Sequence, residues 1–357
     1  MSDIAAGHPH GRAASETGAD PDGMRPDEPL DEALDDVTAE GAAGEPTLLT
    51  VPAGQRADRL DKVLAALLSE HSRSRLQGWI EDGHVRVNGV PAKVRTLVGP
   101  ADRIEVRIQP SPESLAFAPE PIAFTVVADS ADWIVVDKPA GLVTHPGAGN
   151  WHGTLLNGLL HRYPELARVA RAGIVHRLDK DTSGLMVVAR SETAQTHLVR
   201  QLQARTVGRE YLALAHGRLG SARGTIDRPL GRDARVPVRM SVERPIAPKP
   251  AITHYLADRQ GEVPGEGPHA AAAPVTQVIL RLETGRTHQI RVHMASLGHP
   301  LLGDTLYGGR ALAGAARQML HARALRFDDP AGGPPLSFES SLPDDMLAVQ
   351  EAIRWNS

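Results

Sequence analysis

The 357-residue sequence predicts an α+β protein built on a mixed, largely antiparallel sheet. Two observations lead to this fold class. Apolar runs typical of strands outnumber helical patterns, and the two kinds do not alternate along the chain as a doubly wound parallel sheet requires. The strand-like runs are residues 125–128, 133–136, 185–188, 211–215 and 278–282, and the helical patterns are residues 154–162 and 191–203. The length fits about two domains of roughly 100 to 200 residues each.

Residues 1–46 are rich in Ala, Gly, Asp, Glu and Pro and show no apolar periodicity. Such a segment cannot bury enough surface to offset the entropy of ordering, so we predict a disordered acidic tail. Residues 1–50 contain twelve acidic side chains and two arginines, which gives a net charge of −10. Because the whole chain carries −4, the remainder carries +6. A modestly basic body suits a polyanionic partner, although an ordinary soluble protein can carry the same charge.

A small module is predicted for residues 50–109. Leucine and valine recur at helical spacing from Leu60 to Leu68, and Ser72 is a good N-cap for a second helix that ends at Asp82-Gly83. Residues 84–90 predict a strand that enters an Asn-Gly turn, and Ile104, Val106 and Ile108 alternate as another strand. This helix pair with a small sheet resembles the S4 RNA-binding domain.

The proline-punctuated segment 110–121 predicts a linker, and the second domain is predicted to span residues 122–354. Within it, the low-complexity segment 260–274 predicts an exposed loop between two strands.

Several classes of protein are excluded by composition. The chain has no cysteine, which rules out disulfides, thiolate catalysis and zinc–thiolate sites. It has no apolar run of 18 residues, and its N-terminus lacks the basic start and apolar stretch of a secretory signal. We therefore expect a cytoplasmic protein with no membrane partner.

Four polar clusters occur at predicted strand ends, where side chains can converge on a cleft: residues 138–141, 176–184, 209–211 and 283–291. A Mg²⁺ site at Asp179 and Asp181 is disfavoured, because an i, i+2 pair on an extended stretch faces opposite sides. A zinc site at His288 and His293 lacks a further ligand. Neither a glycine-rich phosphate loop nor Gly-x-Ser-x-Gly is present, so we expect no metal and no cofactor. What remains is Asp179 among cations, which a structural ion pair could also explain.

Four long motifs resemble those of the RluA-type pseudouridine synthases. They are HPGAGNWHGTLLNGLL from residue 145, HRLDKDTSGLMVVA from 176, GREYLALA from 208 and RLETGRTHQIRVHMASLGHPLLGD from 281. The resemblance runs from about residue 50 to the end, and only the acidic tail and the 260–274 loop lie outside it.

The resemblance implies a cofactor-free isomerisation of uridine to pseudouridine in RNA. It assigns the reacting carboxylate to Asp179, acting either as the nucleophile toward the ribose or as the base on its 2′ proton. It pairs Arg286 with Asp179 to keep the carboxylate ionised, and it stacks Tyr211 on a flipped-out uracil. Leu320 corresponds to an apolar residue that lines the base pocket, although a core role fits that leucine equally well.

The remaining expected contacts are to RNA. They are Arg73, Arg75, Lys93 and Arg95 in the S4-like module, and His176, Arg177 and Lys180 beside Asp179. The implied partner is 23S rRNA in the large ribosomal subunit or its precursor, at the stem-loop that bridges the subunits. Related enzymes modify other rRNA sites or tRNA, so both alternatives stay open. We expect a monomer that needs no obligate protein partner.

Two rival functions belong to other classes. A non-catalytic RNA-binding assembly factor could keep this fold, but the intact set of Asp179, Tyr211 and Arg286 opposes it. A metal-dependent phosphodiesterase would need a second inward carboxylate that the sequence does not place.

Overall fold

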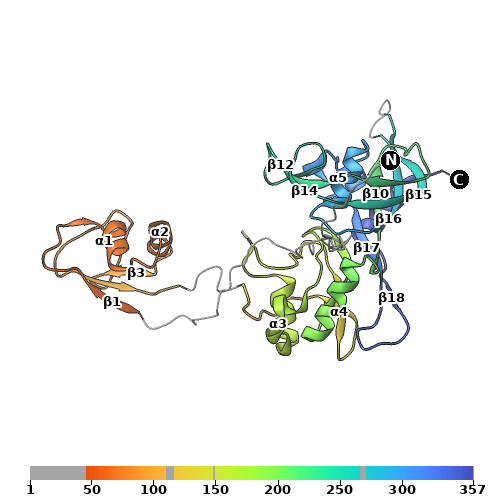
Figure 1. Cartoon of the computed structure of the whole chain (residues 1–357). Helices are drawn as coiled ribbons and strands as arrows, with labels where there is room; N and C mark the ends of the chain where they lie inside the picture. The colour runs from red at the N-terminus through yellow and green to blue at the C-terminus, as the bar shows by residue number, and fades with distance from the viewer. Residues whose placement is uncertain (1–45, 110–115, 148, 266–270, 357) are drawn as a thin grey trace, which may run out of the picture. The chain divides into compact units, whose positions relative to one another are not determined.

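The computed structural model describes residues 46–109, 116–147, 149–265 and 271–356 (Figure 1). Residues 46–109 form an N-terminal module with its own apolar core, and residues 116–356 form a second domain with several core clusters. The predicted acidic tail lies outside the described residues, except for its last residue. Among the described residues, no helix is long and apolar enough to span a membrane.

The N-terminal module packs two helices on a four-stranded antiparallel sheet with the strand order β1-β6-β3-β4. Its elements are β1 (Thr47–Thr50), β2 (Asp58–Arg59), α1 (Leu60–Leu67), α2 (Arg73–Glu81), β3 (Val85–Val87), β4 (Val90–Pro91), β5 (Leu97–Val98) and β6 (Arg103–Val106). The predicted helices, N-cap and turn are confirmed. The Ser72 side chain accepts from the backbone N–H of Arg75. Asn88 and Gly89 have positive φ values of 51° and 80°, which suit a tight hairpin turn.

The second domain is built on one large sheet with the main strand order β11-β15-β16-β10-β17-β9-β8-β7. The strands are β7 (Thr125–Asp129), β8 (Trp133–Lys138), β9 (Ser183–Ala189), β10 (Gly208–His216), β11 (Arg223–Asp227), β15 (Ile252–Val263), β16 (Ala273–Leu282), β17 (Leu320–Phe327), β18 (Leu336–Glu339) and β19 (Arg354–Trp355). The pairing of β9 with β17 is parallel, and the other pairs between these strands are antiparallel. The predicted mixed, largely antiparallel sheet is therefore confirmed.

Alternate residues of the central strands face two apolar layers. Ile134 and Val136 of β8 belong to the core cluster that contains helix α3 (Leu155–Arg162). Trp133 and Val135 belong to the cluster that contains α4 (Glu192–Gln203). Because the side chains of a strand alternate between its faces, α3 and α4 cover opposite faces of the sheet.

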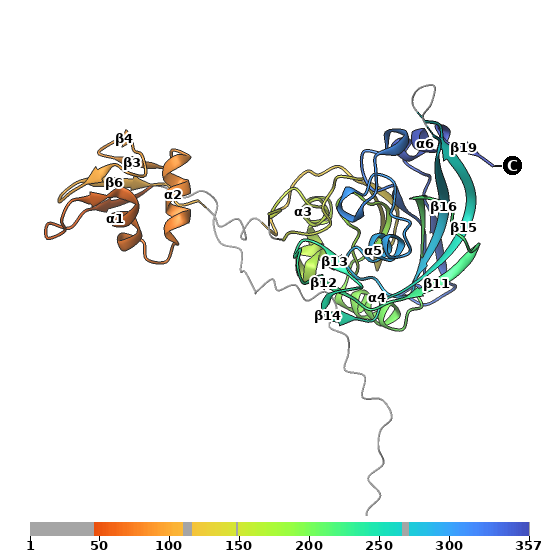
Figure 2. The same cartoon turned by 90° about the horizontal axis from the view of Figure 1, so that it is seen from above.

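The long strands β15 and β16 curve side by side, and helix α5 (Gln289–Ser296) lies on their concave side (Figure 2). Helix α6 (Asp344–Glu351) packs in a further apolar cluster near the C-terminus. A separate three-stranded sheet contains β12 (Leu230–Asp233), β13 (Met240–Ser241) and β14 (Pro245–Lys249). Short 3-10 turns are η2 (Pro164–Arg168), η3 (Ala170–Gly173), η4 (Thr305–Tyr307) and η5 (Leu312–Gly314).

Two predicted boundaries are wrong. The linker was expected to reach residue 121, but the Asn157 side chain of α3 donates to the carbonyls of Ala116 and Ala118, so this part belongs to the second domain. The loop was expected over 260–274, but β15 and β16 remain paired out to Val263 and Ala273. At the first boundary a buried side-chain amide binds two backbone carbonyls, and at the second the backbone pairing of β15 with β16 overrides a low-complexity composition.

A close approach of β9 to β17 positions the segment that precedes β9. Gly184 has φ +116°, and a Cβ built on it would lie 2.3 Å from the carbonyl oxygen of Ala322. Only glycine allows this contact. Ser183 pairs in parallel with His321, and Gly184 pairs with Ala322. This pairing fixes the start of β9, and with it the position of the polar turn at residues 179–182 that comes directly before the strand.

Candidate active site

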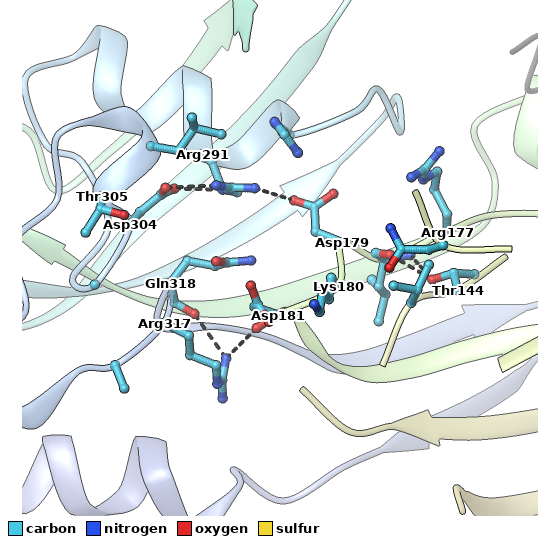
Figure 3. A pocket seen from close by; sticks show the side chains of 17 residues that line it. Thr144, Arg177, Asp179, Lys180, Asp181, Arg291, Asp304, Thr305, Arg317 and Gln318 are labelled. Carbon is cyan, nitrogen blue, oxygen red and sulfur yellow. Dashed lines mark hydrogen bonds and ion pairs between the residues drawn. The ribbon is translucent and has the colours of Figure 1, made fainter. Parts of the chain in front are cut away.

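A cavity of about 470 Å³ opens beside the turn at residues 179–182 (Figure 3). It is lined by Val143, Thr144, Asn150, Arg177, Leu178, Asp179, Lys180, Asp181, His288, Arg291, Gly303, Asp304, Thr305, Leu306, Ala316, Arg317 and Gln318. These residues come from the ends of several elements that are distant in sequence. Four cationic side chains and three carboxylates belong to this lining. The cations suit a polyanionic ligand, and the carboxylates could act on it chemically.

The carboxylate-bearing turn is held by hydrogen bonds on both sides. The fully buried Lys138 ammonium donates to the carbonyls of Pro139 (3.0 Å), Leu142 (2.7 Å) and Lys180 (3.0 Å). Three carbonyl acceptors match the three N–H groups of an ammonium. Burial lowers the pKa of Lys138 to about 7, while the charge of Asp179 opposes this shift. On the other side, Arg317 donates from Nη1 to the carbonyl of Asp181 at 2.9 Å.

Asp179 points toward Arg291 of helix α5 (Figure 3). Nη1 of Arg291 lies 3.2 Å from Oδ2 of Asp179, and the two side chains are 8% and 16% exposed. Arg291 also donates from Nε and Nη2 to the two carboxylate oxygens of the buried Asp304, at 2.7 and 2.9 Å. Burial disfavours the charged guanidinium, but the hydrogen bonds and charges of the two carboxylates outweigh it and raise the pKa of Arg291. The cation beside Asp179 is therefore permanent.

The expected pairing of Asp179 with Arg286 is wrong, because the structure places Arg291 in that position. Arg286 precedes His288, whose positive φ of 56° turns the chain before α5 begins. The backbone N–H of Arg286 donates to Oε1 of Gln289 at 3.0 Å, and its Nε donates to the carbonyl of Pro250 at 3.3 Å. Five residues later, Arg291 projects from the first turns of the helix toward the β9 side of the cavity.

Tyr211 and Leu320 occupy the apolar cluster adjoining the cavity, on strands β10 and β17. Tyr211 is 5% exposed. Burial raises its pKa to about 12, with the charge of Asp179 contributing in the same direction. The phenol is therefore neutral at physiological pH and lies within electrostatic reach of Asp179. Leu320 is 3% exposed. Neither residue is among those that line the cavity, which favours the core role left open for Leu320 and leaves the stacking of Tyr211 on uracil a prediction.

His176 does not face the cavity, which corrects its expected contact with RNA. It is buried, and Nε2 accepts from the backbone N–H of Val187 in β9 at 3.1 Å. Burial lowers its pKa to about 3, so the imidazole is neutral and structural. Arg177 and Lys180 do line the cavity, and the buried Nε of Arg177 has no partner among the described residues. Both cations therefore remain predicted RNA contacts.

Asp181 lines the same cavity as Asp179, so the expectation that the pair faces opposite sides is wrong. The reason is that the segment turns at Lys180 and Asp181 instead of continuing as a strand. Asp181 nevertheless binds Arg317 through its backbone carbonyl. Among the described residues, no three His, Asp or Glu side chains are grouped as metal ligands.

The four basic residues expected to bind RNA in the N-terminal module divide into two kinds. Arg73 donates from Nε and Nη2 to the buried carboxylate of Asp61, at 3.0 and 2.6 Å. Arg75 donates to the carbonyl of Gln109 and lies 5.2 Å from the ring of Trp79. Both arginines are thus engaged in contacts within the module. The side chains of Lys93 and Arg95 are exposed and have no partner among the described residues, so they remain predicted RNA contacts.

Arg291, Asp304, Lys138 and Arg317 were not among the predicted site residues. Lys138 and Arg291 lie inside polar clusters that the sequence does indicate, but their roles depend on which backbone groups and carboxylates the fold brings near. Asp304 ends the last of the four motifs, but its partner Arg291 lies 13 residues away, so the motif does not show the contact. Arg317 reaches the carbonyl of Asp181 across the fold, which its neighbours in the sequence do not indicate.

Comparison with known proteins agrees with this architecture. The model of the RNA pseudouridylate synthase family matches residues 132–296, and that of the S4 domain matches residues 58–104. The chain is 48% identical over 320 residues to ribosomal large subunit pseudouridine synthase D of Vibrio parahaemolyticus, covering 85% of this chain and 94% of that protein. It is 46% identical over 323 residues to the protein of the same name from Neisseria meningitidis, covering 86% of this chain and 81% of that one.

Among solved structures, human RNA pseudouridylate synthase domain containing 1 is similar with a TM-score of 0.52 and 29% identity. The match covers 70% of this chain and 92% of that one. The fold and the carboxylate-centred site thus define an RNA-modifying enzyme. The chain belongs to the RNA pseudouridylate synthase family.

Proposed function

We propose that this protein isomerises uridine to pseudouridine in the rRNA of the large ribosomal subunit, with Asp179 as the reacting carboxylate. The observation that carries the proposal is the pairing of Asp179 with Arg291 in a cavity whose rim holds further cations. Two of the relatives described above are named for the large ribosomal subunit. Within that rRNA, we propose the stem-loop that bridges the subunits as the substrate.

The reaction requires one carboxylate and no redox partner. The bond from ribose C1′ to uracil N1 breaks, a bond from C1′ to C5 forms, the proton on C5 leaves and N1 gains a proton. An ionised Asp179 can attack C1′ or remove the 2′ proton. Arg291 favours the ionised form through its charge and its hydrogen bond. Arg291 donates to Oδ2 of Asp179 and makes two further hydrogen bonds to Asp304, so Oδ1 of Asp179 would face the substrate.

The surrounding residues fit the binding of a flipped-out nucleotide. A base within a duplex cannot reach a carboxylate inside a cavity, so the uridine must leave its stack. Arg177 and Lys180 would bind the flanking phosphates, and Tyr211 would support the uracil from the apolar side. In the N-terminal module, Lys93 and Arg95 offer exposed charges for the same RNA.

The test is to map pseudouridines in total RNA from cells with and without the gene. Loss of specific pseudouridines from large-subunit rRNA, restored by the wild-type gene but not by an Asp179→Asn gene, is the expected result. Loss of pseudouridines confined to tRNA would identify tRNA as the substrate instead. An unchanged pseudouridine map with defective ribosome assembly would favour the rival assembly factor.

A further inference from the structure

A chain of hydrogen bonds runs from the small sheet to the wall of the cavity. The backbone N–H of Met240, in β13, donates to the hydroxyl of Tyr307 at 2.9 Å. The same hydroxyl lies 2.7 Å from Nδ1 of His288. His288 lines the cavity together with Asp179. Its hydrogen bond to Tyr307 uses Nδ1, and Nε2 is not among the buried side-chain atoms left without a partner in the described residues, so Nε2 is accessible to a ligand.

The donors and acceptors of this chain favour one tautomer of the imidazole. The Tyr307 oxygen accepts from Met240, and its own proton needs an acceptor. Nδ1 of His288 lies at hydrogen-bond distance and accepts this proton in the tautomer that leaves Nδ1 unprotonated. A neutral imidazole with a bare Nδ1 carries its proton on Nε2. His288 therefore presents an N–H donor at its solvent-accessible end.

The surroundings keep this imidazole neutral. Burial lowers the pKa of His288. The charge of Asp179 opposes the shift, as does that of Asp304, while the charges of Arg291 and Arg177 reinforce it. Burial also raises the pKa of Tyr307 to about 12, so the phenol keeps the proton that it donates. The pair is thus a fixed donor across the physiological pH range.

We propose that His288 is a catalytic residue that donates its Nε2–H to a carbonyl oxygen of the target uracil. This inference rests on the proposed function. A neutral donor next to Asp179 suits a carbonyl, whereas the cations of the cavity suit phosphate oxygens. When the glycosidic bond breaks, negative charge moves onto the uracil oxygens, and a preorganised donor stabilises that charge more than it stabilises the ground state.

The substitutions that test this role can be matched closely. His288→Gln keeps an N–H donor at the position of Nε2, whereas His288→Leu removes it. Tyr307→Phe removes the hydroxyl but keeps the ring, over which the Arg291 guanidinium lies at 5.0 Å. The Arg291 contact with Asp179 is therefore preserved while the imidazole proton is no longer fixed.

The rate of pseudouridine formation is measured under single turnover with saturating enzyme and large-subunit rRNA fragments. We expect His288→Leu to lower the rate about 100- to 1000-fold, in line with the loss of one preorganised donor. RNA affinity should change less than about twofold, because one neutral hydrogen bond adds little to a phosphate-dominated interface. His288→Gln should recover most of the rate. The rate of Tyr307→Phe should lie between those of His288→Leu and the wild type. Equal slowing by Gln and Leu would overturn the donor role.

Sulfur substitution in the substrate identifies the acceptor. RNA with 2-thiouridine or 4-thiouridine at the target replaces one carbonyl oxygen with a weaker acceptor. One of the two should slow the wild-type enzyme while leaving His288→Leu unaffected. Should His288→Leu fail to fold, Tyr307→Phe replaces it in this comparison. Sulfur effects of equal size in all variants would overturn the inference. A wild-type enzyme that forms no pseudouridine would instead overturn the proposed function.

Discussion

Arg291 holds Asp179 with one N–H and Asp304 with two, so the two carboxylates share a single buried cation. The contacts are 3.2 Å to Oδ2 of Asp179, and 2.7 and 2.9 Å to the two oxygens of Asp304. The side chain of Asp304 is 1% exposed and that of Asp179 is 16% exposed. Asp304 therefore fixes the position of the Arg291 guanidinium. Asp179 lies beside the same positive charge, and its side chain remains accessible from the cavity.

Replacing Arg291 with Met should slow pseudouridine formation and destabilise the protein. The substitution removes the positive charge beside Asp179 and the contact at 3.2 Å that holds its Oδ2. The Asp179 carboxylate then loses the group that orients it in the cavity. The variant should also lose about 3 to 5 kcal/mol of stability, because it leaves a buried carboxylate unpaired. Single-turnover rates and urea unfolding measure both effects.

The matched control is Arg286→Met. Arg286 comes from the same polar segment, but its Nε binds a backbone carbonyl and it is not the cation that pairs with Asp179. Its single-turnover rate and its stability should change less than those of Arg291→Met. A larger loss of rate on replacing Arg286 than on replacing Arg291 would restore the pairing that the family resemblance implies.

Asp179→Asn should abolish pseudouridine formation while folding and RNA binding survive. The amide keeps the shape of the side chain and one contact with Arg291 but supplies neither a nucleophile nor a base. Asp181→Asn is the control, because Asp181 binds Arg317 through its backbone carbonyl, which the substitution preserves. It should keep substantial activity in the same single-turnover assay. A folded Asp179→Asn enzyme with near wild-type turnover would contradict the proposed chemistry.

The sequence predicts the fold class well because its evidence is local. The leucine spacing of α1, the Ser72 cap and the Asn88-Gly89 turn each depend on residues close together in the chain, and each prediction is confirmed. The predicted ends of the strands are wrong where they depend on hydrogen bonds to backbone groups that are distant in the sequence. The pairing of Val263 with Ala273 extends two strands into a segment whose composition favours a loop.

The site is predicted less completely for the same reason. The motif around Asp179 is visible in the sequence, but the choice between Arg286 and Arg291 depends on the left-handed turn at His288. A polar residue in a motif also need not face the ligand. His176 is turned into the sheet to accept a backbone N–H, which sequence spacing does not reveal.

Replacing Lys93 and Arg95 with Ala should weaken RNA binding and reduce its salt dependence. Both side chains are exposed, and each lost phosphate contact lowers the slope of log K against log salt by roughly 0.7 on single-stranded RNA. The rate at saturating enzyme should hardly change. Arg73→Ala is the contrasting variant, because Arg73 pairs with Asp61 and its loss should lower stability more than affinity. Filter binding at several salt concentrations separates the two, and an unchanged slope for the double variant would place Lys93 and Arg95 away from the RNA.

Asp61→Asn should destabilise the N-terminal module and remove part of its pH dependence. The Asp61 carboxylate is fully buried and accepts from Arg59, Arg73 and Gln77. Burial opposes its ionisation, but these hydrogen bonds prevail and lower its pKa to about 2. A carboxyl whose pKa falls on folding contributes stability that is fully present above its usual value and lost as the pH falls through about 2. The variant lacks this contribution at every pH.

We expect a loss of about 1 to 3 kcal/mol near neutral pH, the usual cost of unsatisfied buried polar groups. The difference in the free energy of unfolding between the variant and the wild type should become smaller as the pH falls below 3.8, the ordinary pKa of aspartate. Urea unfolding is followed by fluorine NMR of protein labelled with 5-fluorotryptophan, in which Trp79 reports on the module core. Asp82→Asn is the control, since Asp82 is exposed at the end of α2. Equal midpoints for Asp61→Asn and Asp82→Asn at neutral pH would show that the Asp61 network does not stabilise the module, and Arg73 would again be a candidate phosphate contact.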